Sequence, residues 1–526
     1  MASGMGGMRN VESADSQDID SDDLELVRIT GHKPVLERNY DLFSLLAFSF
    51  MIIDSWIGIV GGLSAGISSG GPAMLIYGAI GVTAMTLTVA LSLAEISGAY
   101  PTSGGQYHWT AELSPPEYGP VLSWFCGYFN VAGWCLLTAS VNIMSSQFVM
   151  AVVVLCHPGF KYQRWQGFIV YQLFNAIFTA INIMGRKNLP SFNKINLFIC
   201  VAIFLAVNIT LLVCSSPKNP VEFVFNTFIN NTGWKSDGMG FIVGLIYPTW
   251  CYSGIDNAVH MAEEIKDARR ALPIVLISTV GMGFATMIIT SLTLSFTISD
   301  LGPIISSTTG TPILEILYNA TKNKAAAVFL LCSILWLVMV ATVGAFQTTN
   351  RLIWAFARDG AMPWSNRFSS IHLRLKVPVN AALLCWATLS VLGVVYLVSS
   401  TAFNAFVGCN VVILNISFAF PIALMLFGRR KYMKPTTFSL GNILGRIINA
   451  IALLWITFMV IFFNFPFQMP VKASNMRIVG LISAISWFWK GHKSYTGPKM
   501  DIGIDAAYRV QLLESITANK HQKEKK

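Results

Sequence analysis

The chain alternates between long apolar runs and short polar connections along most of its length. A helix that crosses the hydrocarbon core of a membrane needs about twenty apolar residues in a row. By that criterion we predict about twelve spans, at residues 42–66, 72–97, 121–155, 165–184, 192–213, 240–261, 274–298, 325–349, 379–400, 404–427, 442–465 and 476–490. The pattern therefore predicts an all-α polytopic membrane protein.

Polar segments flank this apolar region. Residues 1–41 are acidic and low in aromatic side chains, which is typical of a disordered tail, and residues 491–526 end in a basic stretch. We therefore expect one membrane domain over residues 42–490 and a cytosolic tail on either side of it.

Basic residues in the short loops predict the orientation. Loops on the cytosolic side of membrane proteins carry an excess of lysine and arginine. This bias places the basic stretch Arg429–Lys434 and both termini in the cytosol, and we expect the membrane to be the plasma membrane. The glycosylation sequon that begins at Asn230 then lies in an external loop, where a glycan can be attached.

Composition narrows the class of protein. Of the 526 residues 54% are hydrophobic and 12% are charged, and the formal charge is +10. The basic residues lie between apolar runs, so they indicate topology and not a nucleic-acid partner. The nine cysteines include no CxxC pair, and the histidines lie far apart. There is no P-loop, HExxH motif or nucleophile elbow, so we expect no enzymatic activity, metal or cofactor.

Two of the predicted spans contain polar residues and glycines at their centres. The first span carries Asp54 and then Gly58, while span 240–261 carries Pro248, Gly254 and Asp256. Non-helical backbone survives in the hydrocarbon core only where it is buried or lines a cavity. Paired breaks in two halves of a chain indicate an inverted-repeat transporter with its binding site at the midplane. The alternative is a proline kink, with both acids bonded to neighbouring helices.

Longer motifs resemble a known family. The stretches "LAEISGAYPTSGGQYHW" (Leu93–Trp109), "AEEIKDARRALPI" (Ala262–Ile274) and "NRLIWAFARDGAMPW" (Asn350–Trp364) are similar to signatures of the amino acid–polyamine–organocation superfamily. The stretches "AGISSGGPAMLIYG" (Ala65–Gly78) and "SSTAFNAF" (Ser399–Phe406) resemble its fungal amino acid/choline transporter branch, which includes choline and 4-aminobutyrate permeases. The resemblance covers about residues 40–500.

The resemblance implies a five-plus-five inverted repeat with two added helices, alternating access, and a substrate site at the two breaks. The residues that it places at this site are Asp54, Ser55, Trp56, Gly58, Trp250, Tyr252, Ser253, Gly254 and Asp256. Trp250 matches the family position of an aromatic gate, and Trp56 and Tyr252 would complete an aromatic enclosure around a cation. For each aromatic side chain, ordinary helix packing is the alternative.

Coupling and gating residues are also implied by the resemblance. They are Glu95, Gly104, Gly105, Arg351, Arg358 and Asp359. The alternatives are that Glu95 bonds loop amides, that the glycine pair forms a tight turn, and that the remaining residues form an anchor. The family favours protons as the coupling ion. However, some proton-coupled relatives carry a lysine midway along the fifth span, where this chain has Cys200, so sodium stays open.

Together these features predict a secondary active transporter that imports a small amine or amino acid through the lipid bilayer. Asp54 would repel a carboxylate more than an alcohol, which favours choline or a related cationic amine. The alternatives are a 4-aminobutyrate or amino-acid permease, an exporter of a specialised metabolite, and a nutrient receptor that does not transport.

Overall fold

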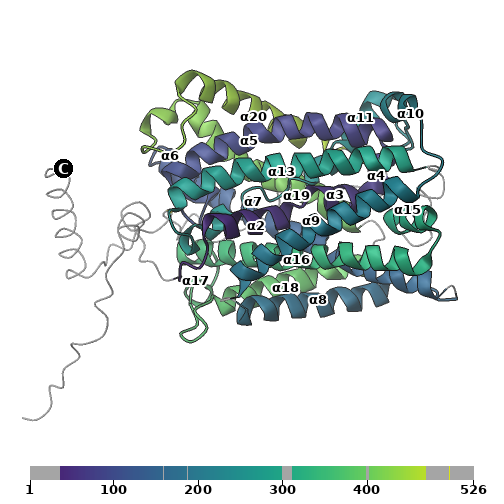
Figure 1. Ribbon diagram of the computed structural model, residues 1–526. Helices are drawn as coiled ribbons and strands as arrows, with labels where there is room; N and C mark the ends of the chain where they lie inside the picture. The colour runs from purple at the N-terminus through teal and green to yellow at the C-terminus, as the bar shows by residue number, and fades with distance from the viewer. Residues whose placement is uncertain are drawn as a thin grey trace, which may run out of the picture. The chain divides into compact units, whose positions relative to one another are not determined.

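The computed structural model describes residues 36–157, 159–185, 188–298, 311–398, 402–469 and 497. In these ranges the regular elements are helices, and one isolated parallel bridge joins Tyr40 to Ile265. Figure 1 shows the long helices lying side by side in a bundle. The predicted all-α membrane fold is confirmed. The predicted tails lie outside the described residues, apart from residues 36–41 and 497.

The first half of the bundle begins with a helix that is interrupted twice. Its elements are α2 (Leu42–Ile53), α3 (Ser55–Gly61), α4 (Leu63–Ser68), η1 (Met74–Gly78), α5 (Ala79–Ala99), α6 (Gln106–Leu113), α7 (Gly119–Cys156), α8 (Arg164–Met184), α9 (Leu189–Cys214) and α10 (Val221–Asn226).

The second half also begins with a broken helix. Its elements are α11 (Asp237–Gly244), α12 (Ile246–Trp250), η2 (Val259–Glu264), α13 (Ala268–Thr297), α15 (Pro312–Thr321), α16 (Lys324–Arg358), α17 (Ser365–Phe368), α18 (Val379–Val398) and α19 (Ala402–Leu426). Beyond this half lie η3 (Arg429–Tyr432) and α20 (Asn442–Phe462).

Ten helices in the described ranges are long and apolar enough to span a membrane. They correspond to ten of the predicted spans. The predicted span 240–261 is divided among α11, α12 and η2, as its glycine and proline content led us to expect. The predicted span 476–490 lies outside the described residues.

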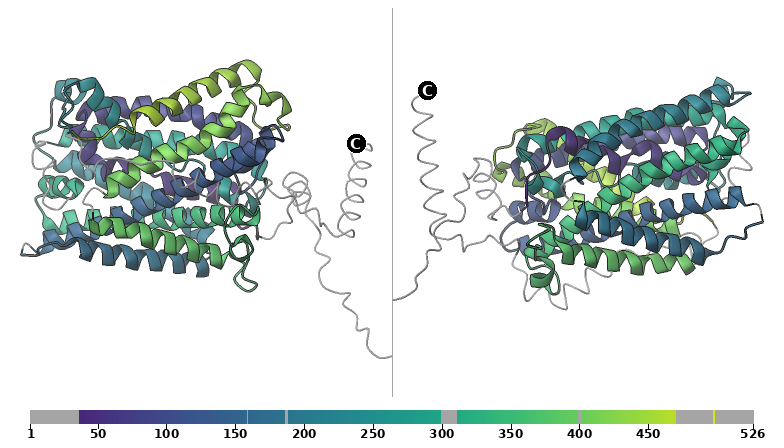
Figure 2. Two further views of the ribbon diagram at one scale, coloured as in Figure 1. Left: turned by 180° about the vertical axis from the view of Figure 1, so that it is seen from behind. Right: turned by 60° about the horizontal axis from the view of Figure 1, so that its bottom comes forward.

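The first broken helix lies inside the bundle. It contacts α9, α13 and α16, and the two views of Figure 2 show the longer helices around it. In the apolar 18-residue stretch of Leu42–Gly61, 89% of the residues are buried, whereas the share in the corresponding stretches of α8 and α9 is 33%. A helix that is apolar on all sides is suited to the interior of a membrane protein. The polar groups at its break are therefore enclosed by protein and not by lipid.

Candidate functional site

The first break is centred on one residue. Helix α2 ends at Ile53, helix α3 begins at Ser55, and Asp54 between them has φ 28° and ψ 61°. Residues other than glycine seldom adopt a positive φ, so the surrounding structure must hold the Asp54 backbone in this strained conformation. Asp54 is 2% exposed, and its Oδ2 accepts a hydrogen bond from the Cys200 thiol at 3.5 Å.

The second break covers more of the chain. Helix α12 ends at Trp250, and turns lead to the 3₁₀ helix η2 at Val259. Gly254 within these turns has φ 82°. A Cβ atom at this position would lie 2.8 Å from the Trp134 ring and 2.9 Å from Leu137, so both the backbone angle and the close contact require glycine.

The two breaks lie directly against each other. The Ser55 hydroxyl donates a hydrogen bond to the Cys251 carbonyl at 2.9 Å, and the Asn257 amide donates to the Ser49 carbonyl at 3.3 Å. A Cβ atom on Gly58 would lie 2.6 Å from the Cys251 sulfur, so glycine allows this close approach. The Cys251 carbonyl, which lies just beyond the end of α12, is thus bonded by the opposite segment.

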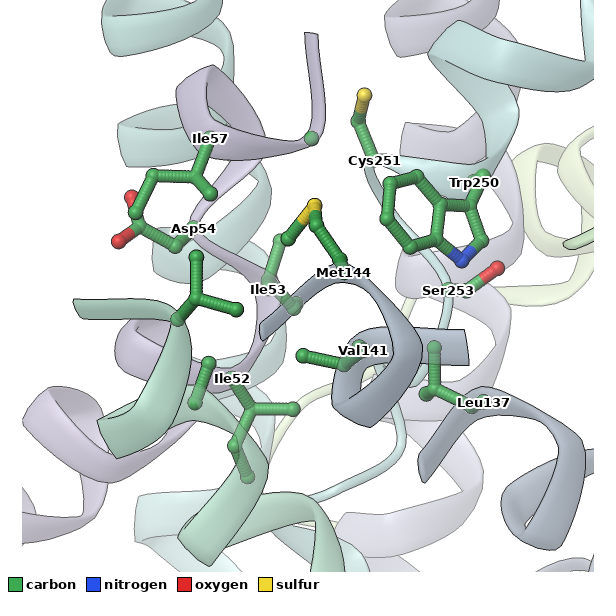
Figure 3. Close-up of a pocket in the computed structure, with 13 residues that line it drawn as sticks. Ile52, Ile53, Asp54, Ile57, Leu137, Val141, Met144, Trp250, Cys251 and Ser253 are labelled. Atoms are coloured by element: carbon green, nitrogen blue, oxygen red, sulfur yellow. The ribbon is translucent and has the colours of Figure 1, made fainter. Parts of the chain in front are cut away.

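A cavity lies between the breaks (Figure 3). Its lining residues are Ile52, Ile53, Asp54, Ile57, Gly58, Leu137, Val141, Met144, Trp250, Cys251, Ser253, Val338 and Ala341. This lining is mostly apolar. In the described part of the chain, three buried polar atoms of the lining have no hydrogen-bond partner: Oδ1 of Asp54, Nε1 of Trp250 and Oγ of Ser253. A few unsatisfied polar groups in an apolar cavity are what a small-molecule site offers.

Asp54 and Trp250 lie on opposite sides of this cavity. In Figure 3 the Asp54 carboxyl group points away from Trp250, and its hydrogen bond to Cys200 on α9 accounts for that direction. In the same view the Trp250 nitrogen and the Ser253 hydroxyl are both on the other side. The geometry therefore suits Asp54 better to an electrostatic or proton-carrying role than to a direct hydrogen bond with a ligand beside Trp250.

The other two aromatic residues of the predicted enclosure do not line the cavity. Trp56 is fully buried and packs edge-on against Phe204, with ring centroids 5.6 Å apart. The Tyr252 hydroxyl shares a hydrogen bond with Thr83 of α5 at 2.8 Å. Both side chains are turned toward neighbouring helices, in keeping with the packing alternative. Trp250 does line the cavity and packs edge-on against Phe403 at 5.4 Å.

Asp256 lies in a polar cluster that is separate from the cavity lining. Its Oδ2 accepts hydrogen bonds from Gln106 Nε2 at 2.9 Å and from Trp134 Nε1 at 3.1 Å, and it lies 2.9 Å from His260 Nε2. The histidines lie far apart from one another in the sequence, which gave no indication of this cluster. The spacing of four residues between Asp256 and His260 was a local signal that they could meet.

The loop "PTSGGQYHW" lies against this cluster. The Ser103 carbonyl is 3.0 Å from His260 Nδ1. Gly105 has φ 57°, and a Cβ atom there would lie 3.1 Å from the imidazole ring. A Cβ atom on Gly104 would lie 2.8 Å from the Tyr107 ring. Gly105 therefore allows the loop to approach the second broken helix, which is the arrangement that an inner gate needs, whereas Gly104 allows a close contact with α6.

The charged residues predicted for this gate form ion pairs. Arg351 Nε donates to Glu264 at 2.6 Å, and Arg358 donates two hydrogen bonds of 2.9 Å to Glu263. The Tyr107 hydroxyl donates to Asp359 at 2.8 Å. These contacts join the end of α16 to η2 and α6.

Glu95 and Asn230 are already engaged by neighbouring residues. Glu95 is ion-paired with Arg430 and accepts a hydrogen bond from the Leu440 amide at 2.9 Å, in keeping with the loop-bonding alternative. The Asn230 side-chain nitrogen donates to the Trp234 carbonyl and to Asp237, each at 3.0 Å. A glycan would displace these two bonds, and glycosylation of Asn230 stays a prediction.

Comparison with known proteins identifies the family of this chain. Residues 42–486 match the model of the family described as amino acid permease. The chain is 37% identical to the choline transporter of Saccharomyces cerevisiae over 88% of this chain and 83% of that protein. It is 30% identical to the amino-acid permease BAT1 of Arabidopsis thaliana, over 92% of this chain and 97% of that protein. The resemblance seen in the sequence motifs is confirmed.

A solved structure shares the fold. The crystal structure of MhsT in complex with L-phenylalanine aligns with a TM-score of 0.53, covering 80% of this chain and 98% of that chain. The two sequences are 13% identical, so the likeness shows a common architecture alone.

Proposed function

The chain belongs to the amino acid permease family, and from that premise we propose that it imports choline or a related cationic amine by proton-coupled alternating access. The family and its relatives make it a transporter for small amine substrates. The relatives reported above are a transporter and a permease, which supports transport and not catalysis. The proposal includes no cofactor, metal or nucleic-acid partner.

The residues that line the cavity between the breaks are the main support for a cationic substrate. Among the described residues that line it, none is basic, and Asp54 is the acidic one. A carboxylate substrate needs positive charge or several N–H donors, whereas a quaternary ammonium is held by an aromatic face and a nearby acid. Trp250 supplies the aromatic face. Asp54 acts through the apolar lining, where charges interact more strongly than in water.

The similarity to the yeast choline transporter supports the same choice. The relatives described as amino-acid permeases favour the alternative, in which 4-aminobutyrate or an amino acid is the substrate. In that case the carboxylate would need donors such as the unpartnered Trp250 Nε1 and the Ser253 hydroxyl.

Asp54 is the proposed proton carrier. An ionised carboxylate buried with a thiol as its hydrogen-bond donor is costly unless a positive charge neutralises it. A proton or a cationic substrate supplies that charge. Because the cavity lies at the breaks, a change in which side it faces would also change which side can exchange a proton with Asp54.

We further propose a plasma-membrane location with both termini in the cytosol. The support is the basic cluster Arg429–Lys434, which follows α19, together with the positive-inside bias of the loops. A protease-sensitive tag on each terminus tests the orientation. When protease is added outside sealed cells, both tags should stay intact. Cleavage of either tag would show that its terminus lies outside the cell and would contradict the proposed orientation.

The test of function is an uptake panel in a host without its own amine permeases. We expect accumulation of radiolabelled choline that excess choline suppresses more strongly than excess 4-aminobutyrate. Equal or reversed potency would replace choline by the amino-acid alternative. Counterflow of labelled substrate in proteoliposomes distinguishes transport from a receptor that only binds, and net movement outward would indicate an exporter.

A further inference from the structure

The second broken helix holds a buried pair that the steps described above do not use. Asp256 is 0% exposed and His260 is 1% exposed. The pair joins three segments, because Gln106 belongs to α6, Trp134 belongs to α7, and Ser103 precedes α6 in the glycine-containing loop.

The hydrogen-bond partners of His260 fix its protonation. Nδ1 faces the Ser103 carbonyl at 3.0 Å, and a carbonyl oxygen can only accept, so Nδ1 must carry a proton. Nε2 faces Asp256 Oδ2 at 2.9 Å, and this oxygen already accepts from Gln106 and Trp134. An oxygen with two other N–H donors is suited to be a carboxylate oxygen and not a hydroxyl. Nε2 therefore carries a proton as well, and His260 is an imidazolium.

We propose that Asp256 and His260 form a proton-binding site that locks the inner gate of the transporter. The proposal rests on the alternating access and proton coupling proposed above, and it adds the residues through which the proton acts on the gate. With its proton bound, His260 holds the loop at Ser103 against the second broken helix. The gate toward the cytosol is then closed.

Loss of one proton would disrupt this lock. A neutral imidazole has one N–H, so one ring nitrogen becomes an acceptor that faces another acceptor, either the Ser103 carbonyl or the Asp256 carboxylate. The released proton passes to water on the cytosolic side, and neutral His260 stays beside ionised Asp256. Acceptor–acceptor repulsion in a buried site favours separation of the loop from the helix. Low pH therefore favours the closed inner gate, and high cytosolic pH favours opening.

Other titratable groups surround the pair. On α7, Cys126 lies within electrostatic range of Asp256. On η2, Glu263 and Glu264 follow His260 and are paired with Arg358 and Arg351 of α16. On α6, His108 is buried, and Tyr107 donates to Asp359, which follows α16. The two ion pairs balance their own charges.

The transport test separates coupling from folding. In proteoliposomes, His260→Gln should lose at least tenfold of the substrate accumulation driven by an imposed proton gradient, while substrate counterflow, which needs no net proton movement, continues. The matched control is His372→Gln, because His372 lies in an exposed loop before α18. Unchanged accumulation by His260→Gln would overturn the proposal. If the wild-type protein itself shows no proton-driven accumulation, the failure belongs to the proposed coupling and not to this site.

A spectroscopic test decides the proton site without transport. In purified protein with ¹⁵N-labelled histidine, one signal should show two protonated ring nitrogens at neutral pH, and this signal should be absent from His260→Gln. If that variant does not fold, the signal can be assigned in the wild-type protein through its proximity to Trp134, whose ring centroid lies 6.0 Å from that of His260. A neutral His260 in the substrate-free protein would overturn the proposal.

Discussion

The two helix breaks each carry a buried aspartate, and the surroundings of the two carboxylates differ. Asp54 in the first break accepts one hydrogen bond from a thiol, and its second oxygen has no partner in the described part of the chain. Asp256 near the second break also has one oxygen without a partner among the described residues, but its Oδ2 accepts from Gln106 and Trp134 and faces His260. The same residue type at the same kind of break is therefore loosely held in one half and firmly bonded in the other.

This difference separates two tasks in the proposed cycle. A weakly bonded acid beside a cavity can exchange its proton or attract a cation with little rearrangement. A strongly bonded acid stabilises one arrangement of its neighbours, and a change in that network moves the segments that carry it. We therefore expect Asp54 to act on substrate and coupling and Asp256 to act on the gate.

The largest expected effect is on stability, from Asp256→Ala. Removing one partner of a buried ion pair leaves the other partner uncompensated and costs about 3–5 kcal/mol. Two further buried donors, on Gln106 and Trp134, would also lose their acceptor. Thermal unfolding of the purified protein should show a clearly lower midpoint.

Asp54→Ala is the matched variant for that measurement. It removes one weak hydrogen bond and a buried carboxyl group whose second oxygen has no partner in the described part of the chain, so its midpoint should stay close to that of the wild-type protein. If both variants unfold at the same temperature, the two aspartates are not held differently and the comparison fails.

The next effect concerns transport by Trp250→Ala. Loss of a cation–π contact in a desolvated site costs about 2 kcal/mol or more, which corresponds to a loss of about thirtyfold in substrate affinity. Trp250→Phe should retain part of the uptake because it keeps an aromatic face. Surface expression should be unchanged in both.

Trp56→Phe is the control for this aromatic prediction. Because Trp56 packs against Phe204 and does not line the cavity, its substitution should leave the KM for substrate near the wild-type value. A large rise in KM for Trp56→Phe, with none for Trp250→Ala, would place the substrate on the opposite side of α3.

A smaller effect is expected on the pH profile of uptake. Asp54→Asn removes the titratable group but keeps the size of the side chain, so uptake should become nearly independent of external pH. Radiolabelled uptake across a pH series measures this directly. An unchanged pH profile with intact transport would leave Asp54 as a structural residue and assign the coupling to the Asp256–His260 pair alone.

The smallest effect is expected at Cys200. Cys200→Ser keeps a hydrogen-bond donor beside Asp54, whereas Cys200→Ala removes it. A single hydrogen bond contributes about 1 kcal/mol, so the two variants should differ by no more than about fivefold in the proton concentration at half-maximal uptake. Identical profiles for the two variants would show that the thiol does not tune Asp54.

Local sequence patterns determined the helices and their breaks. Apolar runs of sufficient length give spanning helices in any arrangement, and Pro248 and Gly254 interrupt a helix through their own backbone chemistry, whereas Gly58 lies within α3 and the first break falls at Asp54. The position of the candidate site at the two breaks followed from the same local rule, because unwound backbone in a membrane must be enclosed by protein. These features needed no knowledge of neighbouring helices.

The tertiary structure alone decided which side chains meet. Trp56 lies next to a lining residue in the chain, yet it faces Phe204, because each step along helix α3 turns the side chain by about 100°. Tyr252, in the turns after α12, likewise lies between two lining residues and yet faces Thr83. In spans that are apolar on all sides, the sequence does not show which face is turned inward. Likewise Asp256 and His260 are local neighbours, but Gln106, Trp134 and the Ser103 carbonyl reach them from more than a hundred residues away. Those partners depend on how helices rotate and pack against one another, which is a property of the assembled bundle.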